Sequence, residues 1–271
     1  MKPRTSKYGA CRLTGTNGKF VKSHLIPRAF TKPEEAGAPM LQAGMSGPVT
    51  VRYDSWYDQQ LCTRVGEDIL ARIDDAAITE LRRLKLVWSG WGTTHTLGAD
   101  HTQLGDTAWG VRSLNGANLS ILRTYFLSLL WRAAATDRFE FAEVSVPDAD
   151  LERIRQLVLS GAPGPIDFYP VSLTQLSTRG LVHNHTPIIR TKSAPATDDL
   201  PEWSIEIVRF YHDGLIAHVH KHSADEGRTA ALGPLIVGGA ERLIVSTVTY
   251  DASFQAETIN KIIERASPPS A

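Results

Sequence analysis

The residue in this chain best suited to chemistry is His24, within Ser23-His24-Leu25-Ile26-Pro27. The preceding Asn17-Gly18 pair is typical of a tight turn, because both residues tolerate positive φ. Pro27 disfavours helical angles at Ile26 and suits the first turn of a helix. The pattern therefore predicts a turn, a strand and then a helix, with His24 at the strand-to-helix junction.

Histidine at such a junction can act as a general base, because free imidazole titrates near neutral pH. The alternative is a structural role, in which the His24 ring holds the turn through hydrogen bonds.

The stretch from Cys11 to Phe30, CRLTGTNGKFVKSHLIPRAF, resembles the first half of an HNH (His-Me finger) endonuclease. It is similar to the Ser-His-x-Ile-Pro variant of that module, which occurs in bacterial proteins. The resemblance is weaker in the second half, Tyr57 to Glu67, and extends to YFLSLLWRAA at 125–134 and LERIRQLV at 151–158. It implies a metal-dependent nuclease with catalytic His24, acting in bacterial defence or a mobile element.

The zinc knuckle of that family is incomplete in this chain. Of its four cysteines only Cys11 and Cys62 are present, and Thr14 and Val65 stand at the other two positions. Two thiolates do not make a four-ligand zinc site, so a structural zinc is not expected.

The family's metal ligands are also changed, because Gly66 or Glu67 stands where its last histidine would be. Carboxylates suit hard cations, so we predict Glu67 as a ligand for Mg²⁺ or Mn²⁺, assisted by Asp54 or Asp58.

The chain has 29 basic and 29 acidic residues and therefore no net charge. Binding to DNA or RNA then requires a local basic patch. The candidates are Lys22 and Arg28 beside His24, and Arg82, Arg83 and Lys85 at the end of a predicted helix. For the second group the alternative is a solvated helix face.

Hydrophobic periodicity predicts an α+β fold in three parts. Residues 1–88 form the N-terminal ββα-type finger with a long helix over 66–87. Residues 89–165 form a helical middle with helices over 118–135 and 148–160 and a short strand over 139–146. Residues 166–271 form an antiparallel sheet, with a hairpin at Asp213-Gly214 and a C-terminal helix.

A second candidate metal site comes from histidines two residues apart, namely His183 and His185, and His218, His220 and His222. Residues at this spacing share one face of a strand, so paired strands could gather the imidazoles around a metal. The alternative is an ordinary polar face.

Other function classes are disfavoured, because the sequence has no phosphate-binding loop and no Gly-x-Ser-x-Gly nucleophile elbow. The longest apolar run contains Arg123 and Arg132, so we expect no membrane association. A polar N-terminus and two cysteines indicate a cytoplasmic protein. The alternative to a nuclease is an inactive HNH-like scaffold that binds nucleic acid, a protein partner or a second copy of itself.

Overall fold

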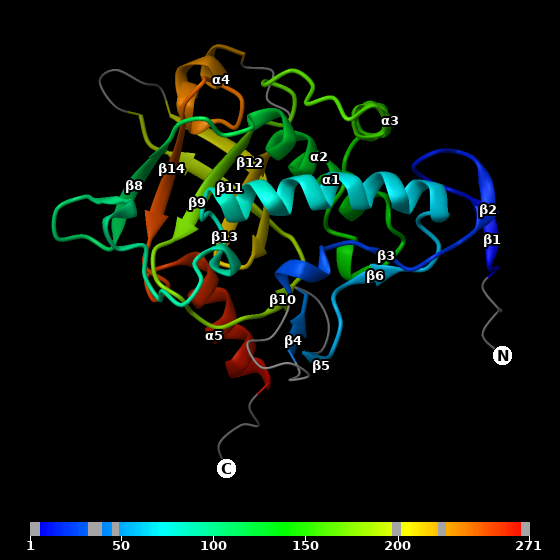
Figure 1. The fold of residues 1–271 in the computed structure, drawn as a ribbon, viewed down its shortest axis with the longest axis horizontal. Coiled ribbons are helices and arrows are strands. Elements are labelled where there is room, and N and C mark those ends of the chain that lie inside the picture. Colours follow the sequence, from blue (N-terminus) through cyan, green and yellow to red (C-terminus); the bar gives the residue numbers. More distant parts are fainter. Residues whose placement is uncertain (1–5, 32–39, 45–48, 197–201, 222–225, 267–271) are drawn as a thin grey trace.

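The computed structural model describes residues 6–31, 40–44, 49–196, 202–221 and 226–266 (Figure 1). The α+β class predicted from the sequence is confirmed, with five α-helices, a seven-stranded sheet and three smaller sheets in these ranges.

The large sheet has the strand order β11-β12-β13-β9-β14-β8-β7. Its strands are β7 (Thr102–Gln103), β8 (Trp109–Leu114), β9 (Val171–Leu176), β11 (Ile188–Ala194), β12 (Trp203–His212), β13 (Leu215–His220) and β14 (Leu243–Val248). The prediction of a purely antiparallel C-terminal sheet is wrong, because β14 runs parallel to β9.

The sheet also includes β7 and β8, which lie in the predicted middle part of the chain, ahead of its first predicted helix. The inward-facing positions of β8 are Gly110, Arg112 and Leu114, and only one of these is aliphatic. This strand therefore lacks the apolar alternation by which a half-buried strand is recognised.

The helices are α1 (Arg64–Arg83), α2 (Leu119–Ala135), α3 (Asp148–Ser160), α4 (Glu226–Leu232) and α5 (Phe254–Ala266). The side chain of Asn118 caps α2, accepting a hydrogen bond of 3.2 Å from the Ile121 amide. Helix α3 has Pro147 at its cap position and Asp148 in its first turn. Helix α2 packs against α1, α3 and β13 and is buried along most of its length.

The smaller sheets pair β1 (Tyr8–Ala10) with β2 (Asn17–Lys19), β3 (Ser23–His24) with β6 (Tyr57–Asp58), and β10 (Asn184–His185) with β4 (Met40–Ala43) and β5 (Thr50–Arg52). Short 3-10 helices cover Arg28–Phe30, Trp88–Gly90, Gly98–Asp100, Phe139–Phe141 and Gly233–Leu235. The strand predicted over 139–146 is therefore wrong. Figure 1 shows β1, β2, β3 and β6 gathered at the end of the molecule where α1 begins.

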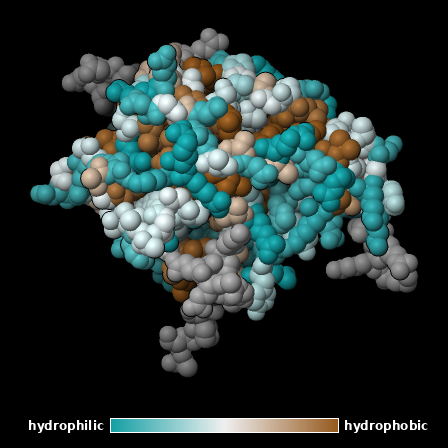
Figure 2. Space-filling view, viewed as in Figure 1, coloured by the Kyte–Doolittle hydropathy of each residue, from teal (hydrophilic) through white to brown (hydrophobic). Residues whose placement is uncertain are grey.

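The main hydrophobic core contains side chains from Cys11 to Val245, so the three predicted parts of the chain pack against one another. On the face shown in Figure 2, hydrophobic side chains lie in small groups among hydrophilic ones. None of the helices in the described ranges is both long enough and apolar enough to cross a bilayer.

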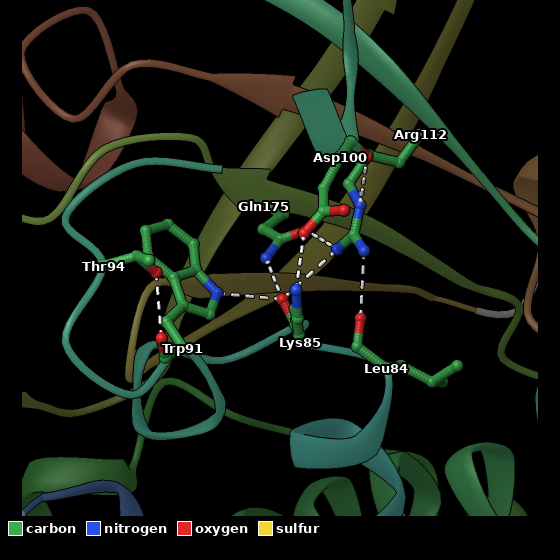
Figure 3. Close-up of polar contacts among 7 residues, drawn as sticks. All are labelled: Leu84, Lys85, Trp91, Thr94, Asp100, Arg112 and Gln175. Carbon is green, nitrogen blue, oxygen red and sulfur yellow. Dashed lines mark hydrogen bonds and ion pairs between the residues drawn. The ribbon is translucent and has the colours of Figure 1, made fainter. Parts of the chain in front are cut away.

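The buried Arg112 fixes the end of α1 to the large sheet (Figure 3). Its guanidinium donates to the Leu84 carbonyl at 3.0 Å and to the Lys85 carbonyl at 3.2 Å. The same Lys85 carbonyl accepts bonds from the Trp91 indole at 2.9 Å and the Gln175 amide at 2.5 Å. Leu84 and Lys85 directly follow the last residue of α1, so the bonds to their carbonyls hold this end of the helix in place.

The predicted hairpin at Asp213-Gly214 is confirmed, with φ of 52° and 81° at these residues. Burial raises the pKa of Asp213 from 3.8 to about 6, although the Ser89 amide donates to its carboxylate at 3.0 Å. Between about pH 4 and pH 6 the folded chain holds a proton that the unfolded chain has lost, so the free energy of unfolding falls as pH rises.

Replacing Asp213 with asparagine should remove this pH-dependent loss, because asparagine can accept the same bond and tolerates positive φ. We expect Asp213→Asn to be about 1–2 kcal/mol more stable than the wild type at pH 7 and equally stable near pH 3. Urea unfolding across this pH range measures the difference, with the exposed Asp251→Asn as control. A difference that does not change with pH would contradict the prediction.

Candidate active site

The backbone at His24 has the predicted conformation, since a short strand pairs with β6 and a 3-10 helix begins four residues later at Arg28. The Leu25 amide donates to the Trp56 carbonyl at 2.8 Å, and buried Arg132 donates to the His24 carbonyl at 3.2 Å. The His24 side chain is 25% exposed. The main chain is thus firmly held while the ring remains accessible from one side.

Asp54 is the carboxylate nearest the His24 ring, with Oδ1 lying 3.6 Å from Nε2. Lys22 forms an ion pair with its other oxygen, and Arg28 Nε lies 4.0 Å from Oδ1. Burial raises the pKa of Asp54, but the hydrogen bond and charge of Lys22 outweigh burial, so the pKa falls below its usual value. Asp54 is therefore a carboxylate anion at neutral pH.

Glu67, in the first turn of α1, is the second carboxylate that interacts with His24. Burial raises its pKa, while the Ser23 hydroxyl and the charges of Arg132 and His24 oppose that rise. Glu67 Oε2 and His24 Nε2 are both buried atoms without a hydrogen-bond partner in the described structure. The neighbouring Ser23 hydroxyl is unpaired in the same way, and an ion or water bound among these atoms would satisfy them.

Asp58 pairs with Ser23 in the short β3–β6 sheet, but both of its side-chain oxygens are used within the protein. Oδ2 accepts from the Thr136 hydroxyl at 2.6 Å and Oδ1 from the Gln60 amide at 2.7 Å. Of the three predicted metal ligands, the structure therefore places Asp54 beside the His24 ring and Glu67 in electrostatic interaction with it, and it assigns Asp58 to a bond with the end of α2.

Within the described ranges, no group of three or more His, Cys, Asp or Glu side chains is arranged to hold a metal ion. Mg²⁺ is commonly held by one or two carboxylates, with water and substrate phosphate completing its shell. Asp54 and Glu67 are of the residue type that such an open site uses, and Glu67 has an unpaired oxygen.

Comparisons of this chain with protein-family models, with curated proteins and with solved structures found no match.

The Arg132–Asp74 ion pair supports the site from behind, and the sequence analysis missed it. Arg132 is only 1% exposed, and its guanidinium donates to the two Asp74 oxygens at 2.6 and 3.0 Å. It thereby joins α2, α1 and the His24 backbone. The signal in the sequence is an arginine within an otherwise apolar helix, since a buried charge requires a partner.

The two cysteines lie side by side at the start of α1, and both are free thiols. Gly66 packs against them so closely that an added Cβ would lie 2.5 Å from Cys11 Sγ. The hydrogen bond with Cys62 lowers the pKa of Cys11 to about 4 against the effect of burial, and the same contact raises the pKa of Cys62. The remnant of the family's knuckle is therefore a pair of buried free cysteines at the start of α1.

The predicted nucleic-acid contacts fall into two separate places. Lys22 and Arg28 lie beside the candidate active site, where Lys22 Nζ also sits 4.2 Å from the centre of the Tyr57 ring. Arg82 is fifteen residues along α1 from Glu67, which corresponds to ~22 Å at the rise of an α-helix.

At that distant end each cation has a partner within the chain. Arg82 donates to the Ser89 hydroxyl at 3.0 Å, and Arg83 pairs with Glu80 at 2.7 Å. Lys85 pairs with Asp100 at 2.9 Å (Figure 3). These residues take part in holding the helix end and do not extend the basic surface around His24.

The paired histidines are separated by the fold. His183 and His185 lie at β10, in a different sheet from His218 and His220 on β13, and His222 lies outside the described residues. The Nε2 atom of His218 accepts from Arg209 at 3.2 Å, and that of His220 bonds to the Ser172 hydroxyl at 3.0 Å. Strand pairing therefore does not bring the two groups together.

Proposed function

We propose that this protein is a metal-dependent nuclease of HNH-like type, which hydrolyses phosphodiester bonds. The observation that carries the proposal is the partly exposed His24 ring with Asp54 Oδ1 at 3.6 Å from Nε2. Glu67, which interacts electrostatically with His24 and has an unpaired buried oxygen, is the second carboxylate.

The finer architecture belongs to the same proposal. The β1–β2 turn, strand β3 and the start of α1 correspond in order to the ββα-type finger that the Ser23-to-Pro27 motif resembles. The second half of the motif, from Tyr57 to Glu67, contributes strand β6 and the first turn of α1. Action in bacterial defence or within a mobile element remains part of this proposal, as does a cytoplasmic location.

His24 would act as the general base. Asp54 faces its Nε2 atom, so Nδ1 would take the proton from the attacking water while the phosphorus–oxygen bond to the leaving group breaks. Asp54 and Glu67 would hold Mg²⁺ or Mn²⁺. When bound, the ion would stabilise the negative charge that develops on the leaving oxygen. Arg132 would keep the His24 backbone in place through its bond to the carbonyl.

One observation favours the alternative, an inactive scaffold that binds nucleic acid or a protein partner. Lys22 already forms an ion pair with Asp54 and lies where a cation bound to Asp54 would compete with it. A nuclease must displace or share this lysine when the ion binds, whereas a scaffold can keep the ion pair permanently.

Cleavage of plasmid and single-stranded substrates in Mg²⁺, Mn²⁺ or EDTA distinguishes the two functions. We expect cation-dependent cleavage that Glu67→Gln and Asp54→Asn each reduce by roughly 10²-fold, since an ion in such a site contributes several kcal/mol. Asp68→Asn is the matched control, because Asp68 is adjacent to Glu67 but 53% exposed. Cleavage that persists in EDTA, or no cleavage with either cation, would contradict the nuclease proposal.

A further inference from the structure

A groove of about 530 Å³ lies directly beside the His24–Asp54 pair, and no role has been assigned to it. Its lining comes from the β4–β5 sheet, from the segment 52–57 between β5 and β6, and from the 3-10 turn at residues 138–140. Asp54 is itself a lining residue, so the groove and the candidate active site share one wall. Its volume is within the ~300–1,000 Å³ typical of ligand sites.

Two aromatic rings lining this groove are exposed to solvent. Tyr53 is 70% exposed and Phe139 is 66% exposed, although aromatic side chains are usually buried to a large extent. Tyr53 immediately precedes Asp54 in the chain, and both residues line the groove. Exposed rings in a groove are suited to stacking against flat, unpaired bases.

The charge around the groove also favours a polyanion. The acidic residues among its lining are Asp54, which pairs with Lys22, and Glu140, which pairs with Arg138 at 2.7 Å. Arg52 lines the groove as a further cation and has an exposed side chain. The chain as a whole has no net charge, so this is a local excess of positive charge.

We propose that the groove binds a single-stranded segment of nucleic acid, with unpaired bases stacked on Tyr53 and Phe139 and phosphates near Arg52 and Arg28. In a duplex the base faces are covered by neighbouring bases, so the two rings cannot reach them. This inference rests on the proposed nuclease function and names its substrate, in which the scissile phosphate lies in an unpaired stretch.

Binding can be measured without cleavage by fluorescence anisotropy of the His24→Ala chain in EDTA. The probes are one labelled 12-nucleotide sequence as single-stranded DNA, as single-stranded RNA and as a DNA duplex. We expect both single strands to bind at least about tenfold more tightly than the duplex, and Tyr53→Ala or Phe139→Ala to weaken single-strand binding by about 5- to 100-fold. Tyr53→Phe, which keeps the ring, should bind as the parent does.

The matched control is Tyr8→Ala, because Tyr8 is 66% exposed on β1 and does not line the groove. Arg52→Gln should lower the slope of log affinity against log salt concentration by about one, because one phosphate contact is lost. Tyr53→Ala should leave that slope unchanged.

Equal affinity for duplex and single strand, or equal effects of Tyr53→Ala and Tyr8→Ala, would overturn the inference. So would a complete lack of nucleic-acid binding. If single strands bind through Tyr53 but the wild type cleaves nothing in Mg²⁺ or Mn²⁺, the nuclease proposal fails while the binding site stands. If the wild type cleaves substrate but neither Tyr53→Ala nor Phe139→Ala weakens single-strand binding, the proposed binding site is wrong and the nuclease proposal is kept.

Discussion

Replacing His24 with alanine should reduce cleavage by about 10²- to 10⁴-fold, the usual contribution of a general base. Alanine removes the imidazole that we propose takes the proton from water. The strand pairing with β6 and the bond from Arg132 use main-chain atoms and survive the substitution. The variant should therefore fold normally and bind substrate with little change.

The measurement is the single-turnover cleavage rate with excess enzyme, so that substrate affinity does not limit the rate. His95→Ala is the matched control, because His95 is an exposed histidine on another loop. Thermal unfolding of both variants confirms that the fold is kept. Equal rates for His24→Ala and the wild type would show that the ring has only a structural role.

The second large effect is on stability, and it follows from the ion pair behind the site. Asp74→Asn should lower the free energy of unfolding by about 3–5 kcal/mol, since it leaves the Arg132 guanidinium buried without its anion. Arg132 is 1% exposed and Asp74 15% exposed, so water cannot replace the lost partner. Asp75→Asn changes a neighbouring but exposed carboxylate and should have almost no effect.

Urea unfolding of the two variants provides the comparison. Combining Asp74→Asn with Arg132→Met should restore part of the lost stability, because a buried apolar side chain needs no partner. If Asp74→Asn and Asp75→Asn unfold alike, the pair contributes little and Arg132 must be satisfied by other groups. Even with its stability partly restored, the double variant should cleave more slowly than the wild type. The reason is that the His24 carbonyl has lost the hydrogen bond from Arg132.

Much of the fold could be predicted because its signals are local. The apolar spacing along 66–87 and 118–135 marks α1 and α2, since each helix buries a face determined by its own sequence. Asp213-Gly214 specifies its hairpin for a similar reason, because both residues adopt positive φ. The strand-to-helix junction at His24 follows from Pro27 in the same way.

Other features depend on residues distant in the chain. The parallel pairing of β14 with β9, and the addition of β8 to the large sheet, are decided by which edges meet after the helices pack. A strand with Arg112 facing inward is recognisable only when its partners, the carbonyls at the end of α1, are in place.

The candidate site likewise has features set by local sequence and features set by tertiary packing. By itself the sequence determined that His24 stands at the junction and that carboxylates occur nearby in the chain. Only the tertiary structure decided that Asp54 lies against the ring, that Glu67 interacts with it electrostatically and that Asp58 bonds to Thr136 instead. The physical reason is that local conformation depends on neighbouring residues, whereas the choice of partners depends on how β6, α1 and α2 pack around β3.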